Sequence, residues 1–417
     1  MIRTISSLDI GSHKIACVIA EYDEEKDITT IKGASIRETK GIEGGKINNK
    51  LFISSITKAV AQAEKMYGKN ITSLLVSISG IKAKPVFINR EYFSKKPMLT
   101  VFDYEKITQE MIAEYSLKQE NILHSFPISW TKQGHGDTKN TTNMFDVKFF
   151  LSVAPAKDIE VFEKIIKSNI VHKIDLITAN TGVYSAMAVR DDIDEGGTLI
   201  VDMGCDSTKF CILANSNVIY ANSLKIAGKI ITYDIAMVLK VDESVAEKIK
   251  IANTDLKLDQ YEENEMISFD FDGYSDNDDV FRVSKYNKKL INDIYTSRVE
   301  EIFKYIFKDI EKHNLSKTFN KIILTGGSSG VRGLDLLIQN LYGITTKQGN
   351  IADINIAQPL VADQIKNPVY ATSIGLILAG VHIIKRRIQN SRNYSTDNYI
   401  VRFIQNFTKI LMDLFIS

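Results

Sequence analysis

The sequence predicts a duplicated α/β fold with an inserted α+β subdomain in the first half. The main observation is a repeated phrase, an apolar run followed by Asp, one spacer and Gly, at residues 6–12 and again at 198–204. Each copy precedes a second strand-like run, at 14–21 and 209–214. A single Asp-x-Gly usually just starts a turn. Two copies in corresponding places, each within alternating strands and helices, indicate a repeated unit.

Each copy has the chemistry of a phosphate-binding hairpin. Glycine lets backbone N–H groups close on phosphate oxygens, and Ser12 and Ser207 add hydroxyl donors. Asp9 and Asp202 end buried strands, where they could reach a magnesium ion directly or through water. Two such hairpins facing each other would hold a nucleotide triphosphate between two domains.

The bulk composition is that of an ordinary soluble globular protein. The chain has 417 residues, 44% hydrophobic and 25% charged, which suits several subdomains. A formal net charge of +1 gives no reason to expect a nucleic-acid partner. The cysteines, Cys17, Cys205 and Cys211, lack metal-like spacing and predict a reducing compartment. We expect neither an export signal nor an uncharged apolar stretch long enough to span a bilayer.

Strands and helices alternate through the first half up to residue 80. Strands are expected at 30–36 and 73–79, on either side of a helix at 51–66. Residues 81–168 have alternating strands, compact helices and no phosphate loop, so they are interpreted as the inserted subdomain. Its expected elements, and those that close the first half, are strands at 86–93, 122–130 and 146–153, helices at 104–118 and from 156, a resumed α/β pattern at 174 and a helix at 183–190.

The second half opens at residue 198 and carries an insertion of its own. Two short helices, an acidic loop-like stretch at 270–279 and a long helix at 285–313 are expected there. A strand at 321–325 then runs into Gly326 and Gly327, before a helix at 331–342. This arrangement permits close backbone approach to a flat ligand and points helix N–H groups at phosphate or ribose.

The last twenty residues are amphipathic. On a helix, one face is apolar, whereas the opposite face is polar and includes Arg402 and Lys409. Polar residues on nearly every turn exclude spanning, but the pattern suits a helix lying among lipid headgroups. A basic leash at 385–397 would be attracted to anionic lipid. Docking on the protein's own core is the alternative, which the leash disfavours. The predicted membrane face comprises Ile400, Phe403, Ile404, Phe407, Leu411, Leu414 and Phe415.

The order of these motifs resembles the actin, Hsp70 and sugar-kinase superfamily of ATP-binding proteins, whose fold is actin-like (ribonuclease H-like). Within it the chain is most similar to the bacterial FtsA family. The resemblance covers essentially the whole chain, including an inserted subdomain where actin has none, and it implies ATP and Mg²⁺ as cofactors. The motifs that carry it lie at residues 8–14, 41–45, 75–80, 322–327 and 368–376.

The resemblance implies a cofactor site built from both halves, with Asp9 and Asp202 at the metal. It also suggests a base and ribose site near Glu247 and Lys250, which sit three apart on one helix face; a surface ion pair is the alternative. The expected cofactor-binding residues are Asp9, Gly11, Ser12, His13, Lys14, Asp202, Gly204, Ser207, Gly228, Glu247, Lys250, Gly326, Gly327 and Ser328.

The second phosphate loop departs from the family pattern Asp-x-Gly-Gly-Gly-Thr-x-Asp. Cys205 and Asp206 replace two glycines, and Lys209 replaces the closing acid. Acids in these loops of the superfamily's ATPases position magnesium and the attacking water, which a lysine cannot do. We therefore expect ATP binding with weak or absent hydrolysis, hence no enzyme and no catalytic residues. Lys209 would either neutralise a phosphate or point to solvent.

The resemblance implies a cell-division protein that tethers the FtsZ ring to the cytoplasmic face of the inner membrane at the septum. It would be peripheral, form filaments with itself and recruit later divisome membrane proteins. The C-terminal tail of FtsZ would bind Arg298, Lys288 and Lys289, whose cations suit an acidic peptide. The alternative is an exposed helix face with Arg298 paired to Glu300 or Glu301. A scaffold of type IV pilus assembly and a membrane-associated ATPase or kinase are the competing functions.

These expectations divide the chain into nine segments. The first-half core takes 1–80 and 169–196 around the insertion at 81–168, and the second-half core takes 197–227 and 301–360 around the insertion at 228–300. The remaining segments are a return to the first-half core at 361–384, a linker at 385–397 and the amphipathic membrane-targeting helix at 398–417.

Overall fold

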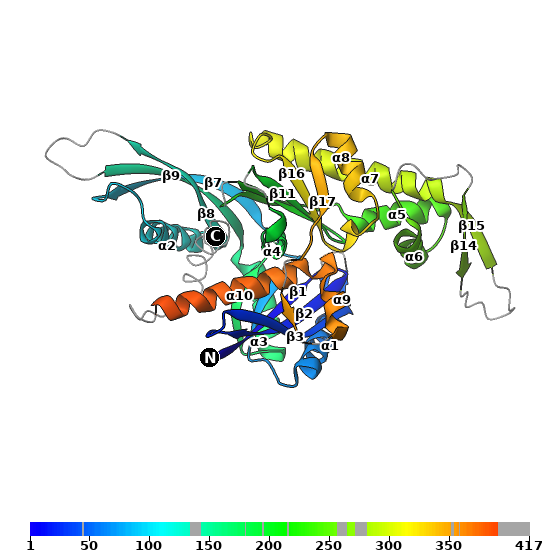
Figure 1. Cartoon of the computed structure of the whole chain (residues 1–417), viewed down its shortest axis with the longest axis horizontal. Coiled ribbons are helices and arrows are strands. Elements are labelled where there is room, and N and C mark those ends of the chain that lie inside the picture. Colours follow the sequence, from blue (N-terminus) through cyan, green and yellow to red (C-terminus); the bar gives the residue numbers. More distant parts are fainter. Residues whose placement is uncertain are drawn as a thin grey trace.

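Two mixed sheets, one for each half, form the body of the protein in this computed structural model (Figure 1). The described residues are 1–43, 46–133, 143–179, 181–193, 196–214, 217–256, 265–271, 282–351, 354–357 and 359–390. The predicted tail helix and most of its leash therefore lie outside the described residues.

The first sheet has the strand order β10-β6-β1-β2-β3-β18. Its elements are β1 (Ile2–Ile10), β2 (Lys14–Asp23), β3 (Ile28–Glu38), β6 (Ser73–Ile78), β10 (Lys173–Thr178) and β18 (Asn355–Ile356), with helices α1 (Asn49–Tyr67) and α4 (Thr181–Ala188) and a small hairpin of β4 (Ile42–Glu43) and β5 (Lys46–Ile47).

The second sheet has the order β13-β12-β11-β16-β17. Its strands are β11 (Thr198–Met203), β12 (Thr208–Ala214), β13 (Asn217–Leu224), β16 (Lys321–Thr325) and β17 (Thr345–Gln348). The helices of this half are α5 (Gly228–Leu239), α6 (Glu243–Asn253), α7 (Lys288–Lys312) and α8 (Leu334–Tyr342).

The two sheets repeat one topology. In each, three consecutive strands pair antiparallel, and the first of them then pairs parallel with a strand that arrives much later in the chain. A further parallel strand completes each set, β10 beside β6 and β17 beside β16. The predicted duplicated α/β fold is confirmed by this shared order.

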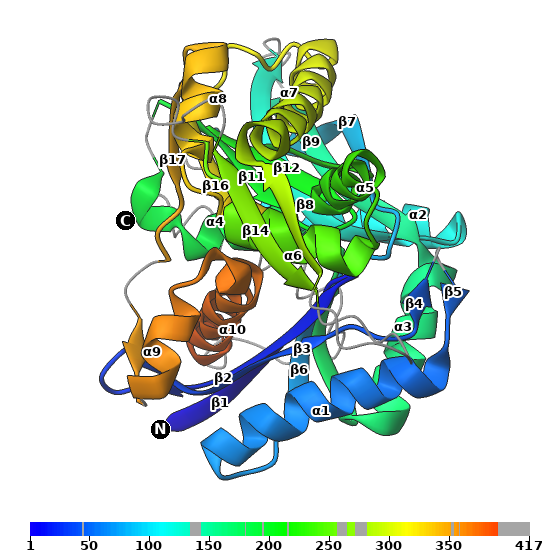
Figure 2. The ribbon, with the colours of Figure 1, turned by 90° about the vertical axis from the view of Figure 1, so that its right-hand side faces the viewer.

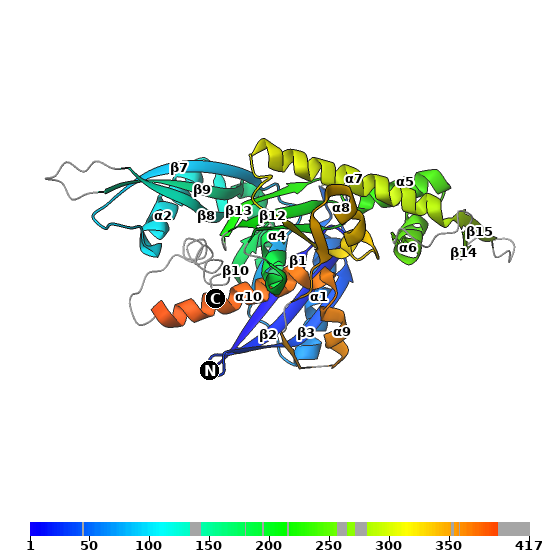
Figure 3. The same cartoon turned by 45° about the horizontal axis from the view of Figure 1, so that its top comes forward.

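Helices cover both faces of the first sheet, as the alternation along β2 requires. Ile15, Cys17 and Ile19 share a core with α1, whereas Ala16 and Val18 belong to the large core that includes α4 and the last helix. That large core continues into the second sheet, so both halves are packed together. Figure 2 shows α1 and the last helix along the first sheet, and Figure 3 shows α4 beside that helix at the junction of the halves.

The inserted subdomain is an antiparallel sheet with the order β7-β9-β8 and one helix. It contains β7 (Lys84–Ser94), α2 (Val101–Leu117), β8 (Glu120–Gln133) and β9 (Asn143–Pro155). Helix α3 (Ala156–Asn169), which the sequence placed in this subdomain, instead packs into the first-half core through Ile159, Phe162 and Ile166. The apolar face of α3 is satisfied by α1 and β10, so the expected boundary at residue 168 comes one helix too late.

The second insertion contains a hairpin that the sequence did not predict. Strands β14 (Met266–Phe271) and β15 (Arg282–Asn287) pair antiparallel, so the long helix begins at Lys288 rather than at residue 285. Asn287 caps this helix through its side chain, which accepts a hydrogen bond from the Leu290 amide. Most of the expected acidic loop lies outside the described residues. Figure 1 shows this hairpin and the inserted subdomain at opposite ends of the long axis.

The chain ends, within the described part, on a helix that returns to the first half. After α9 (Pro359–Ile365), helix α10 (Ala371–Asn390) packs on α4 and β1. Gly375 allows this approach, because a Cβ there would lie 1.8 Å from the Tyr184 carbonyl oxygen. Helix α10 also runs past the expected start of the leash: Lys385 is helical and pairs with Asp27 at 2.5 Å.

One stretch of the described chain, Pro368–Lys385, is long and apolar enough to cross a membrane, which corrects the expectation that no such stretch exists. It is 72% buried inside the protein, so it is a core helix.

A buried histidine lies where β8 meets the first sheet. The His124 ring nitrogen Nε2 is 2.9 Å from Thr178 Oγ1, and the side chain is fully buried. Burial lowers the pKa of His124 to about 3, since the charged ring would lose its hydration.

Candidate functional site

The two predicted hairpins turn in the same way. The Gly11 amide donates to the Lys14 carbonyl at 2.8 Å, and the Gly204 amide donates to the Ser207 carbonyl at 3.1 Å. In both turns a Cβ on the glycine would lie 2.9 Å from that same carbonyl oxygen. Only glycine fits these turns without a shift of backbone, so the repeated glycine has a repeated structural cause.

One cleft joins the two hairpins, and both halves line it. Ten of the fourteen predicted cofactor residues lie on its wall: Asp9, Gly11, Ser12, His13, Lys14, Asp202, Gly204, Ser207, Gly326 and Gly327. The volume of the cleft is about 50 Å³. The predicted cleft between Gly11, Gly204 and Gly327 is therefore present.

Six further residues line the cleft, and none of them is among the fourteen predicted cofactor residues. Their signals were present but weak: four lie in segments that carried the family resemblance, and two are departures in the second loop. They are Ser79, Cys205, Lys209, Pro368, Val369 and Thr372.

Two carboxylates and two ammonium groups meet inside the cleft. Burial and the neighbouring Asp202 raise the pKa of Asp9, while Lys14 and Lys209 act to lower it. Burial lowers the pKa of both lysines, and both carboxylates oppose that effect. The Lys14 ammonium also donates to the Val369 carbonyl. These four groups form one coupled electrostatic cluster.

Lys209 points into the cleft rather than to solvent. It is only 6% exposed, and its Nζ donates to Ser79 Oγ across the cleft at 2.7 Å. The interpretation that Lys209 points to solvent is therefore wrong.

Gly326, just after β16, allows the Asp202 carboxylate to lie close to the backbone. Its φ is +89°, and a Cβ would lie 2.3 Å from Asp202 Oδ1. The other Asp202 oxygen, Oδ2, accepts hydrogen bonds from Ser185 Oγ at 3.0 Å and Thr372 Oγ1 at 3.4 Å. This carboxylate is thus oriented by hydroxyl groups from two helices, α4 and α10, and the glycine turn leaves room for it.

The segment after Gly326 differs from the sequence expectation. Gly327–Ser329 form a 3₁₀ turn, and α8 begins only at Leu334, capped by Gly333. The N–H groups at the start of α8 therefore do not belong to the cleft, whose wall ends at Gly327. The extra turn follows from the positive φ at Gly326, which redirects the chain before a helix can start.

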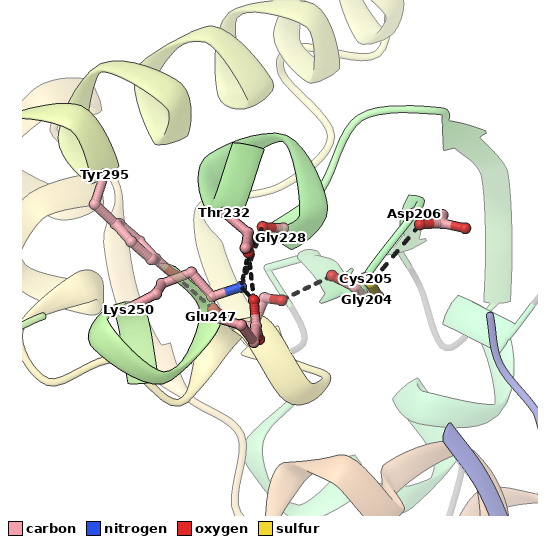
Figure 4. Close-up of polar contacts among 9 residues, drawn as sticks. Gly204, Cys205, Asp206, Gly228, Thr232, Glu247, Lys250 and Tyr295 are labelled. Atoms are coloured by element: carbon pink, nitrogen blue, oxygen red, sulfur yellow. Dashed lines mark hydrogen bonds and ion pairs between the residues drawn. The ribbon is translucent and has the colours of Figure 1, made fainter. Parts of the chain in front are cut away.

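The remaining four predicted cofactor residues are Gly228, Glu247, Lys250 and Ser328, and they form a cluster beside the second hairpin. Figure 4 labels the first three of them. Ser328 Oγ and the Gly228 amide both donate to the Gly204 carbonyl, at 2.8 and 3.1 Å. Lys250 Nζ donates to the Gly228 carbonyl at 3.1 Å and to Glu247 Oε2 at 2.6 Å.

Lys250 is 7% exposed and also donates to Thr232 Oγ1 at 2.7 Å. The alternative of a surface ion pair is wrong for this residue. Tyr295 supports the same region, because its hydroxyl donates to the Ser328 carbonyl at 2.8 Å. The cluster joins α5, α6 and α7 to the edge of the cleft.

The predicted FtsZ-tail residues lie along the start of α7, where their charges already have partners. Arg298 donates to both Asp234 oxygens, one at 3.0 Å, and to Glu301. Lys288 pairs with Glu265 at 2.9 Å. The pairing of Arg298 with Glu301 agrees with the alternative that Arg298 pairs with an acid on its own helix. The pairing with Asp234 on α5 could not be predicted, because Asp234 lies 64 residues away in the chain.

The charges in the cleft suit phosphate oxygens better than a metal ion. Within the described part of the chain, no group of three or more His, Cys, Asp or Glu side chains could hold a metal by itself, so a magnesium ion would depend on Asp9, Asp202 and the phosphates. Lys209 interacts electrostatically with both Asp9 and Asp202. A magnesium ion at these carboxylates would therefore lie near a positively charged ammonium group. Glycine turns, hydroxyls and two lysines fit a polyphosphate, whereas the predicted magnesium ion does not fit.

The fold and this cleft define an actin-like protein. Among solved structures, the chain is similar to that of a PilM–PilN type IV pilus biogenesis complex, with a TM-score of 0.61 and 16% identity over 90% of this chain and 98% of the other. It is also similar to MreB5 of Spiroplasma citri bound to AMPPNP, with a TM-score of 0.53 and 13% identity over 93% and 99%.

Sequence comparison narrows the class. The family model of the cell division protein FtsA matches residues 199–375. FtsA proteins of Agrobacterium fabrum and Borreliella burgdorferi are 24% and 25% identical over 90% of this chain, and over 86% and 90% of their own lengths. FtsA of Buchnera aphidicola is 25% identical over 98% of both. Over most of its length the chain is therefore similar to FtsA cell-division proteins.

Proposed function

We propose that this protein tethers the FtsZ ring to the cytoplasmic membrane and binds ATP in the cleft between its halves. The observation that carries the proposal is the single cleft lined by Gly11, Gly204 and Gly327, with two lysines beside the paired glycine turns. The MreB5 structures bound to AMPPNP and to ADP have the same fold and support a nucleotide in this position.

ATP would act by holding the two halves at one angle. Its phosphates would contact a hairpin from each half, and its base and ribose would lie toward the cluster of Gly228, Glu247 and Lys250. Binding would therefore favour the state in which both halves are closed, and a filament built from that state would be stabilised. Hydrolysis would be weak, because Lys209 occupies the position of an acid that orients water in the family's pattern.

The membrane part of the proposal rests on the sequence of the tail. An amphipathic helix at 398–417 would lie in the headgroup plane of anionic lipid at the inner face of the membrane, at the septum. One such helix binds weakly, so stable attachment would need several copies side by side. A filament with all tails on one side would supply them, and its outer surfaces would recruit later division proteins.

A co-sedimentation assay with anionic vesicles and FtsZ tests this function. The intact chain should carry FtsZ into the vesicle pellet, whereas a chain ending at Ser391 should stay in solution, with an unchanged circular dichroism spectrum and unchanged nucleotide binding. A shortened chain that still pellets with vesicles would contradict the tether.

The second candidate function is the scaffold of type IV pilus assembly. The similarity to the PilM–PilN complex favours it at the level of fold. That function does not need an amphipathic anchor, so the same vesicle assay separates the two. A membrane-associated ATPase would instead show many turnovers per minute by the purified protein.

A further inference from the structure

Lys209 lines the cleft. It lies on β12, which pairs with β11 on one side and β13 on the other. In the register of the second hairpin it lies opposite Asp202, the position that Ala16 takes opposite Asp9 in the first hairpin. The long side chain leaves β12, crosses the cleft and reaches Ser79 of the first half. A residue that is small in one copy of the repeat is thus a buried cation in the other.

The positive charge of Lys209 acts on both carboxylates of the cleft. It interacts with Asp202 and with Asp9, one from each half. Asp9 Oδ1 is buried without a hydrogen-bond partner within the geometric limits among the described residues, and Ser77 is the hydroxyl that acts with the two lysines to lower the pKa of this carboxyl. A buried cation that lines the same cleft as one carboxylate of each half supplies part of the positive charge that a divalent metal ion would otherwise provide.

The charges of the cleft sum to zero without any metal. Asp9 and Asp202 contribute two negative charges, and Lys14 and Lys209 contribute two positive ones. Replacing the acid of the family pattern by a lysine changes the local charge by two units, which is the charge of one Mg²⁺ ion. Adding that ion to the cleft before a nucleotide enters would leave the buried cluster with two excess positive charges, which a water-poor site opposes.

We infer that the Lys209 ammonium takes the place of the divalent cation, so that this protein binds the phosphates of a nucleotide without Mg²⁺. The inference rests on the proposed nucleotide binding. The incoming phosphate oxygens replace the Val369 carbonyl and Ser79 Oγ as partners of Lys14 and Lys209, in charge-assisted hydrogen bonds. Because a lysine joins the halves through Ser79, the cleft also stays closed over its own charges before a nucleotide enters.

The first arm of the test uses the wild-type protein and a fluorescent ATP analogue. Its affinity is measured with excess Mg²⁺ and with excess EDTA. We expect the affinity in EDTA to equal or exceed that in Mg²⁺. A fall of about tenfold or more on removing Mg²⁺ would overturn the inference.

The second arm measures Mn²⁺ binding to the nucleotide-free protein by electron paramagnetic resonance. Wild type should bind Mn²⁺ only weakly, whereas Lys209→Asp should gain a site of at least about tenfold higher affinity, and Lys209→Gln a weaker gain. Lys225→Gln, which removes an exposed lysine close by in sequence, should match wild type. Equal Mn²⁺ binding by wild type and both Lys209 variants would contradict the inference.

The two arms separate this inference from the proposed function. Failure of the analogue to bind with or without Mg²⁺ would refute nucleotide binding, and the Mn²⁺ arm would still decide whether Lys209 excludes a metal. Should Lys209→Asp fail to fold, as its melting curve would reveal, Lys209→Gln and the wild-type comparison decide the matter. In the analogue assay, Lys209→Gln should bind about ten- to a hundredfold more weakly than wild type in EDTA, because a charged donor is lost.

Discussion

Replacing Gly326 with alanine tests how the glycine turn after β16 (Lys321–Thr325) holds the cleft together. The residue has a φ of +89°, where a Cβ is strained. That Cβ would lie 2.3 Å from Asp202 Oδ1, 2.6 Å from the Met203 carbonyl oxygen and 2.8 Å from the Met203 amide nitrogen. Two of these atoms are backbone of the central strand β11. Alanine can be accommodated only if the end of that strand moves.

The cost of Gly326→Ala follows from two separate effects. An L-residue with left-handed backbone angles costs about 1–2 kcal/mol. Overpacking a filled site costs about 1–3 kcal/mol more. The sum of roughly 2–5 kcal/mol is a large part of the 5–15 kcal/mol that typically stabilises a domain. At about 2–4 °C per kcal/mol for a unit of this size, the melting temperature should fall by roughly 4–20 °C.

Thermal melting followed by circular dichroism measures this effect, with Gly330→Ala as the matched control. Gly330 lies in the same loop with a φ of −72°, and no atom of the described residues lies within 4 Å of the place where its Cβ would stand. The control should stay within about 1 kcal/mol of wild type. Binding of the ATP analogue should weaken in Gly326→Ala alone, since Asp202 is displaced. Equal melting temperatures for the two variants would refute the reasoning.

Three further changes have defined outcomes. His124, with its pKa lowered to about 3, stays neutral when folded, so stability is full above pH 6.5 and is lost below it as the unfolded chain takes up a proton. The free energy of unfolding should fall by about 2 kcal/mol from pH 7 to pH 5. Urea titrations at the two pH values should find a smaller loss in His124→Gln. The control His172→Gln, at an exposed position, should show the same loss as wild type. Asp234→Asn should release Arg298 and tighten binding of an acidic FtsZ-tail peptide in fluorescence anisotropy, whereas Arg298→Gln should weaken it; no change in either would contradict the predicted site. Gly375→Ala should destabilise the packing of α10 on α4 by about 1–3 kcal/mol, and an unchanged melting temperature would argue against the close contact.

The local elements of this fold could be predicted from the sequence. The strand at 321–325 has the predicted bounds, and the helix expected at 51–66 is found as α1, Asn49–Tyr67. Hydrophobic periodicity and glycine turns act over a few residues, which is why they are readable without a structure. The paired Asp-x-Gly phrases also predicted the cleft, because strands of a repeated unit bring corresponding turns to corresponding places.

Elements that depend on distant partners were missed or misplaced. The hairpin of β14 and β15 was missed because the acidic stretch at 270–279, which overlaps only the end of β14, predicted a loop. Helix α3 was assigned to the insertion because of its position along the chain, whereas its apolar face packs against α1 and β10. Periodicity shows that a face is apolar but not which surface will cover it.

The sequence by itself determined the repeat, the two glycine turns and the identity of the charged groups in this protein. Only the tertiary structure decided which of those charges are buried together. Lys209 meets Ser79 from 130 residues away, and Lys14 meets Val369 from 355 residues away. A lysine has the same local pattern whether it faces water or a carboxylate. Whether it is buried depends on two free energies: the cost of removing its charge from water, and the gain from the partners that the whole fold places around it.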